Sequence, residues 1–108
     1  MPNCSARTAH PENPAGGLPS AITTAWCGSV RGRGAPIVTT TDGQSNAIVW
    51  IVGAEGDSQL HGFRGDTGEP LFTGPHQPMT GLRHFQTLIA TEDRLYVAAD
   101  GSVYAFRF

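Results

Sequence analysis

The chain has 108 residues, 39% apolar and 15% charged, which suffices for one small domain or for a piece of a larger one. Its formal net charge is −2 and its seven basic residues are scattered arginines, which excludes the clustered basic surface that nucleic acids and anionic membranes require. No apolar run approaches the roughly 20 residues that span a bilayer, and the N-terminus lacks the charged and then apolar regions of a secretory signal. We therefore expect neither a nucleic-acid partner nor a membrane span.

The N-terminal part of the chain is irregular by composition. Residues 1–20 hold four of the eight prolines, and they show neither the helical period of 3.6 nor the strand period of 2. We therefore predict an irregular Pro/Gly-rich segment there. Residues 21–34 form a second region, with a short strand predicted over 21–27 and a glycine-rich connector over 28–34.

The two cysteines, Cys4 and Cys27, are too far apart for a CxxC redox pair or for half of a zinc knuckle. A disulfide between them, formed in an oxidising compartment, is one interpretation, and two unrelated thiols are the other. The sequence leaves both the pairing and the compartment open.

From residue 35 onward, β-branched and aromatic runs alternate with turn residues. No stretch long enough for a helix shows apolar residues at the helical spacing i, i+3, i+4 and i+7. Strands are predicted, in chain order, over residues 36–41, 47–52, 59–63, 70–73, 85–90, 94–99 and 102–106. Asp42-Gly43 marks a loop, and Asp100-Gly101 is typical of a tight hairpin turn that needs a positive φ. The predicted fold class is all-β.

The strand predicted over residues 47–52, with the sequence AIVWIV, is apolar on both faces. A strand of an antiparallel sheet with one solvated face would alternate between apolar and polar residues. We therefore expect this sheet to be covered on both sides.

A repeat relates two parts of this all-β region. Residues 60–64 (LHGFR) lie over residues 103–107 (VYAFR) with a constant offset of 43 residues. Repeats of 40 to 50 residues built from four short antiparallel strands are the signature of a β-propeller, whose blades bury their faces against their neighbours. We predict a propeller fragment of about two four-stranded antiparallel blades over residues 35–108, namely a blade at 35–73 and an incomplete blade at 85–108.

The stretch LHGFRGDTGEPLF contains the tripeptide Arg64-Gly65-Asp66, which has two interpretations. It could be an adhesion signal, or it could be part of a structural connector between the third and fourth strands of a blade. Asp or Thr can bond a nearby backbone N–H, and Gly68 can adopt the positive φ that other residues resist, so Asp66-Thr67-Gly68 is typical of a turn. Its place in a repeated connector favours the structural interpretation.

This connector and its flanking strands resemble the pyrroloquinoline-quinone (PQQ)-type propeller repeats of quinoprotein dehydrogenases and their non-catalytic relatives. Blades of that family carry a tryptophan-docking pattern, A-x-D-x-x-T-G-x-x-x-W. Here the pattern retains the Thr-Gly pair and replaces Ala, Asp and Trp by Gly, Arg and Phe, and it falls on Gly62, Arg64, Thr67, Gly68 and Phe72. The final repeat, DRLYVAADGSVYAFRF, is similar to a common phrase of the family, and the resemblance covers about residues 26–108.

Propellers of that family have six to eight blades, so the resemblance implies the C-terminal part of a longer propeller or a truncated relative. The partners it implies are the remaining blades. Alternatively, residues 21–27 could serve as the missing outer strand of the last blade, within the chain or by exchange with a second copy. With so few strands we expect exposed apolar blade faces and self-association.

The resemblance also implies where a cofactor would lie. In quinoproteins of the family, the quinone stacks on a tryptophan near a calcium ion held by carboxylates and amides, and an aspartate acts as the base. Here Trp50 is interpreted as core and Trp26 as part of an outer strand. The acidic residues are interpreted as turn residues: Asp42, Glu55, Asp57, Asp66, Asp93 and Asp100. No metal-ligand spacing is formed by the histidines: His10, His61, His76 and His84. We assign no catalytic, cofactor or metal residue.

Two functions follow from these expectations. The favoured one is a non-catalytic PQQ-like propeller segment that acts as a structural or binding scaffold, with a protein ligand as one potential partner. The alternative is the C-terminal portion of a PQQ- and calcium-dependent quinoprotein dehydrogenase whose catalytic residues lie outside this chain. The resemblance favours the bacterial periplasm or exterior as the compartment.

Overall fold

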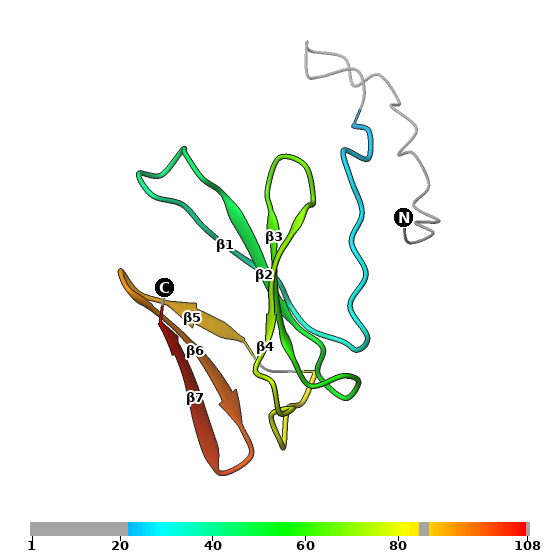
Figure 1. Ribbon diagram of the computed structural model, residues 1–108, viewed down its shortest axis with the longest axis vertical. Helices are drawn as coiled ribbons and strands as arrows, with labels where there is room; N and C mark the ends of the chain where they lie inside the picture. The colour runs from blue at the N-terminus through cyan, green and yellow to red at the C-terminus, as the bar shows by residue number, and fades with distance from the viewer. Residues whose placement is uncertain (1–21, 85–86, 108) are drawn as a thin grey trace, which may run out of the picture.

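The computed structural model describes residues 22–84 and 87–107, which form two antiparallel sheets and no helix (Figure 1). Sheet 1 has the strand order β1-β2-β3-β4, and sheet 2 has the order β5-β6-β7. The strands are β1 (Ile37–Thr39), β2 (Ile48–Val52), β3 (Leu60–Arg64), β4 (Pro70–Gly74), β5 (Leu88–Ala90), β6 (Arg94–Ala99) and β7 (Ser102–Arg107). The predicted all-β class is therefore confirmed. In the described part of the chain, no helix is long and apolar enough to cross a membrane.

The seven strands predicted from residue 36 onward all occur, with small shifts at their ends. β1 begins only after Pro36, because proline has no N–H to donate to the ladder. Its C-terminal end is earlier than predicted, since the N–H of Thr41 donates to the carbonyl of Ser45 at 2.9 Å and so closes the β1–β2 loop. β5 starts at Leu88 instead of residue 85, and residues 85–86 lie outside the described ranges.

The strand predicted over residues 21–27 is wrong for the part that the structure describes. Residues 22–27 form no strand, so they are no outer strand within this chain. A β-branched run becomes a strand only beside a free strand edge, and this segment runs past sheet 1 without pairing (Figure 1). The connector meets the sheet later, where the N–H of Arg33 donates to the carbonyl of Ala54 at 2.8 Å.

The main core lies between the two sheets. Sheet 1 contributes Trp50, Val52 and Leu60 from one face, and sheet 2 contributes Leu95 and Val97 from the face opposite. The other face of sheet 1 carries Phe63, which is also buried. Sheet 1 is thus covered on both faces around β2 and β3, as the two-sided apolar pattern of β2 predicts.

The segment between the sheets is tied to both of them through its backbone. The N–H of Met79 donates to the carbonyl of Ser58 in the β2–β3 turn, and the carbonyl of Gly81 accepts from the N–H of Asp100 in the β6–β7 turn, both at 2.9 Å. Met79 and Leu82 are buried in the core between these bonds. The segment therefore fixes the ends of two hairpins against each other.

Some expectations fall on residues outside the described ranges. These are the irregular segment at residues 1–20, His10 and Cys4. Cys27 is disulfide-bonded, and no free cysteine occurs among the described residues. The predicted pairing partner, Cys4, lies outside the described residues.

Replacing Leu60 by alanine should lower the free energy of unfolding by about 2 to 5 kcal/mol, because Leu60 is fully buried between the sheets and its loss leaves a cavity. The matched control is Leu71→Ala on the neighbouring strand β4, where the leucine is 46% exposed and the expected cost is under about 1 kcal/mol. Urea unfolding followed by circular dichroism measures both. Equal costs for the two variants would contradict the two-sheet core.

Candidate functional site

The residues that match the docking pattern lie on two neighbouring strands and the connector between them: Gly62, Arg64, Thr67, Gly68 and Phe72. We call them the docking motif. Gly62 and Arg64 are on β3, Phe72 is on β4, and Thr67 and Gly68 are in the connector between the two strands. The N–H of Gly68 donates to the carbonyl of Arg64 at 2.8 Å, and the N–H of Arg64 donates to the carbonyl of Glu69 at 2.9 Å. These bonds make the connector a closed turn.

β3 and the β3–β4 connector hold the side chain of Trp26, which comes from the segment before sheet 1. The indole Nε1 of Trp26 donates to the carbonyl of Gly65 at 2.8 Å, and the Trp26 ring lies 6.0 Å from the ring of Phe63, centroid to centroid. A Cβ atom at Gly68 would lie 2.6 Å from the indole ring. Gly68 also has a φ of 77°. Glycine is thus required twice here, for the turn and for the close approach of the indole.

A second tryptophan uses the other glycine of the docking motif. A Cβ atom at Gly62 would lie 2.7 Å from the ring of Trp50, which is paired with Gly62 across β2 and β3. The Nε1 of Trp50 donates to the hydroxyl of Thr39 at 2.9 Å, so the polar atom of this core side chain is satisfied. Trp50 therefore packs in the core between the sheets.

Arg64 and Asp66 bind each other. The guanidinium donates from Nε to Oδ1 at 3.0 Å and from Nη2 to Oδ2 at 2.8 Å. The side-chain hydrogen bond from Arg64 lowers the pKa of Asp66, and the same bond raises the pKa of Arg64. An adhesion signal would have to offer both charges to a receptor, whereas this two-bond pair closes them on each other. The geometry favours the connector interpretation of this tripeptide.

Phe72 extends the docking motif toward sheet 2. Its ring lies 6.1 Å from the ring of Trp50 and 6.1 Å from the ring of Phe106 on β7. Phe106 is the counterpart of Phe63, since the two are 43 residues apart in the repeat. Phe72 therefore meets sheet 2 at the same position at which Trp26 meets sheet 1.

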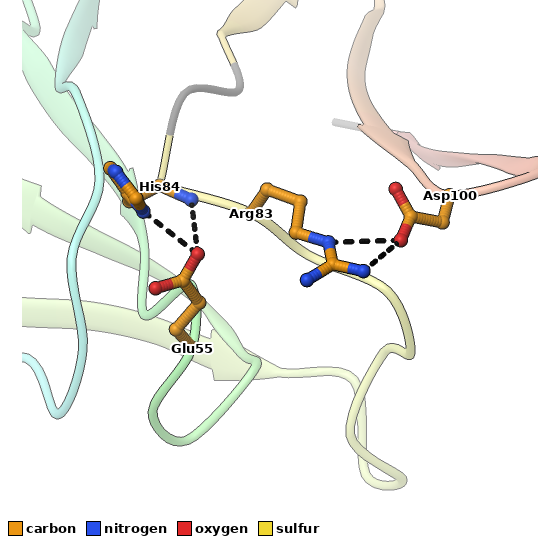
Figure 2. A network of polar contacts seen from close by, with 4 residues as sticks. All are labelled: Glu55, Arg83, His84 and Asp100. Atoms are coloured by element: carbon orange, nitrogen blue, oxygen red, sulfur yellow. Dashed lines mark hydrogen bonds and ion pairs between the residues drawn. The ribbon is translucent and has the colours of Figure 1, made fainter.

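A set of charged residues that sequence analysis did not group lies at the opposite end of the sheets (Figure 2). Glu55 of the β2–β3 turn accepts from the Nδ1 of His84 at 2.8 Å, and from the backbone N–H of His84 at 3.2 Å. Arg83 binds Asp100 of the β6–β7 turn, with its Nη2 2.6 Å from Oδ2. We call Glu55, Arg83, His84 and Asp100 the clasp, because it links one hairpin turn of each sheet to the segment between them.

The acidic residues expected at turns are engaged there. Asp42 accepts from the backbone N–H groups of Gln44 and Ser45, which lower its pKa. Asp57 accepts from the N–H of Gln59 and lies 2.7 Å from the Nε2 of His61. In residues 22–84 and 87–107, no group of three or more His, Cys, Asp or Glu side chains is placed to hold a metal ion.

With this geometry in hand, comparison with known proteins adds no identity. No protein-family model, no curated protein and no solved structure matches the chain. A function must therefore follow from the contacts themselves.

Gly68→Ala should lower the free energy of unfolding by more than backbone strain alone would. Gly43→Ala is the matched control, since Gly43 has a φ of 87° and an added Cβ would meet nothing within 4 Å. We expect about 1 to 2 kcal/mol for the control, and at least about 1 kcal/mol more for Gly68→Ala because the indole must move and lose its hydrogen bond. Urea unfolding gives the energies, and the Trp26 indole N–H resonance reports the displacement. Equal costs would show that Trp26 is not seated on Gly68.

The clasp should make stability depend on pH in acid. The hydrogen bond from the His84 side chain, followed by the one from its backbone, lowers the pKa of Glu55 below the ordinary glutamate value of about 4.3. In the acid range the unfolded chain therefore binds more protons than the folded chain. The stabilisation from ionised Glu55 is present above the ordinary glutamate pKa, and it is lost as the pH falls through the lowered pKa.

Between pH 6 and pH 3.5, the urea midpoint of unfolding should fall less in Glu55→Gln than in the wild type. Asp42 and Asp66, whose pKa values are also lowered, continue to contribute in both proteins. Glu92→Gln, in the exposed β5–β6 turn, is the control and should follow the wild type. Parallel losses in Glu55→Gln and the wild type would contradict the contact with His84.

Proposed function

We propose that the chain is a pair of adjacent blades of a PQQ-like β-propeller and that it acts as a non-catalytic structural or binding scaffold. One observation carries the proposal. The contact of Trp26 with Phe63 at 6.0 Å and that of Phe72 with Phe106 at 6.1 Å join equivalent positions of the repeat. In a propeller each blade packs on the next through the same surface, so such a contact must recur once per blade.

The position of Trp26 supports the PQQ-like assignment in particular. The pattern found in the sequence is a tryptophan-docking pattern, and a tryptophan from the preceding segment lies on its glycine, Gly68, with its indole N–H bonded inside the connector. Trp26 is thus placed as the end of a preceding blade would be. Phe72, at the pattern's own aromatic position, makes the matching contact with sheet 2.

The carboxylates of this chain support a structural role for the chain itself, while the quinoprotein alternative places its cofactor ligands outside it. Asp57 lies against His61, Glu55 against His84, Asp66 against Arg64 and Asp100 against Arg83. Each pair serves a turn or the clasp, and these carboxylates do not converge. A calcium site needs several converging oxygen ligands.

The end of sheet 1 that carries the connector is the proposed binding face. A hollow of about 460 Å³ lies there between the β1–β2 loop and the β3–β4 turn, and its lining includes Asn46, Arg64 and Leu71. Exposed loops held by a rigid sheet are the usual place for recognition. The disulfide of Cys27 supports an oxidising compartment, such as the periplasm or the cell exterior.

Double-mutant cycles test the repeated contact. The pairs Trp26→Leu with Phe63→Leu, and Phe72→Leu with Phe106→Leu, should each show a coupling of about 0.5 to 1.5 kcal/mol in urea unfolding. The crossed pair, Trp26→Leu with Phe106→Leu, is the control and should be additive. Coupling at only one contact, or at neither, would contradict blade-like packing. Under the quinoprotein alternative, PQQ and calcium should stabilise a longer protein that contains this chain, because the cofactor residues would lie outside the chain itself.

A further inference from the structure

One edge of sheet 2 is open. β7 is the counterpart of β3 in the repeat, and β3 pairs on its outer side with β4. Beyond β7 no strand pairs in the part of the chain that the structure describes. An open edge presents unpaired backbone N–H and C=O groups, which favour the addition of another strand.

One face of sheet 2 is open as well. Val103, paired with Ala98, is 68% exposed, whereas its counterpart Leu60, paired with Val52, is fully buried. Ile89, in register with Tyr96, is 61% exposed, whereas its counterpart Ile37 packs against the core between the sheets. Sheet 2 covers one face of sheet 1. The equivalent face of sheet 2 is also apolar, but nothing in the described residues covers it.

The complementary surface lies at the other end of the same chain. Trp26 sits on sheet 1 as Phe72 sits on sheet 2, so residues 22–28 occupy the place of a fourth strand that belongs to a preceding sheet. Their backbone pairs with no strand in the described residues, and their sequence, ITTAWCG, carries no charge. On the face of sheet 1 that points away from sheet 2, Val49 and Ile51 are the counterparts of the fully buried Leu95 and Val97, yet both are only partly buried.

We infer that a second copy of this chain occupies the open edge and face of sheet 2. Residues 22–28 of the second copy pair antiparallel with β7, as β4 pairs with β3, while their Trp26 stays on its own Phe63 and Gly68. The same arrangement lays Ile89, Tyr96 and Val103 over Val49 and Ile51 of the second copy. This repeats between chains the contact that joins sheet 1 to sheet 2 within one chain.

The association is head-to-tail, because the two surfaces differ. Such an interface adds further copies until the rotation closes a ring or a filament forms. The inference rests on the repeat relation behind the proposed function, and it adds the identity of the missing neighbour.

The test is the mass of the 108-residue chain in solution, measured by size-exclusion chromatography with light scattering. The wild type should exceed the 11.4 kDa of one chain. Val103→Asp and Val49→Asp should each give monomers whose circular dichroism matches that of the wild type. Val103 is exposed and Val49 is only partly buried in the single chain, whereas a charge at either position would be buried in the assembly. Val103→Ile is the matched control and should keep the wild-type mass.

Mixing the two charged variants gives the sharpest outcome. One variant keeps the sheet 1 surface intact and the other keeps the sheet 2 surface intact. The mixture should therefore form a dimer of twice 11.4 kDa, which has no intact surface left for a third chain. A monomeric wild type, or a mixture that stays monomeric, would overturn the inference. Concentration-dependent protection of the β7 amides and of residues 22–28 from hydrogen exchange in the wild type tests the same contact without any substitution, and its absence would also overturn it.

The two proposals fail separately. If the chain is monomeric but the two aromatic couplings are present, blade-like packing stands and the second copy is not the neighbour. If the couplings are absent, the repeat relation itself is wrong.

Discussion

The structure depends on aromatic rings that lie against glycines. Gly62 leaves room for Trp50 within sheet 1, and Gly68 leaves room for Trp26 from the segment before it. A small antiparallel sheet has too little apolar surface to be stable alone, so each sheet here needs cover from a neighbouring segment. The bare backbone at these two glycines lets a large ring approach closely enough to provide that cover, and the remaining packing follows from it.

Strand positions were predictable because they follow local patterns. Apolar and β-branched runs such as that of β2, separated by turn residues, identified every strand from residue 36 onward. Residues 22–27 have the same local character and are not a strand, because strand formation requires a partner edge as well as a favourable composition. Met79 and Leu82 were missed as core residues for a related reason, since single apolar residues among Pro, Gly and Thr show no period.

The docking motif could be located from its resemblance to a known pattern, but the tryptophan that lies against it could not. Trp26 and Gly65 are bonded across 39 residues of chain, and no periodicity encodes such a contact. The pairing of Arg64 with Asp66 also depends on the turn geometry, which the three letters do not reveal. The clasp was missed for the same reason, because its members come from two turns and a linking segment that only the fold brings together.

The clasp and the aromatic contacts perform different tasks. Burial of apolar surface between the sheets is favourable in any orientation, since the hydrophobic effect is non-directional, and it does not by itself fix the angle between sheets 1 and 2. Directional bonds do so: Glu55 to His84, Arg83 to Asp100, and the backbone bonds of Met79 and Gly81. Although exposed ion pairs contribute little to stability, those of the clasp hold two hairpin turns in register. The proposed blade arrangement requires that constant angle, because a small error would accumulate with every added blade.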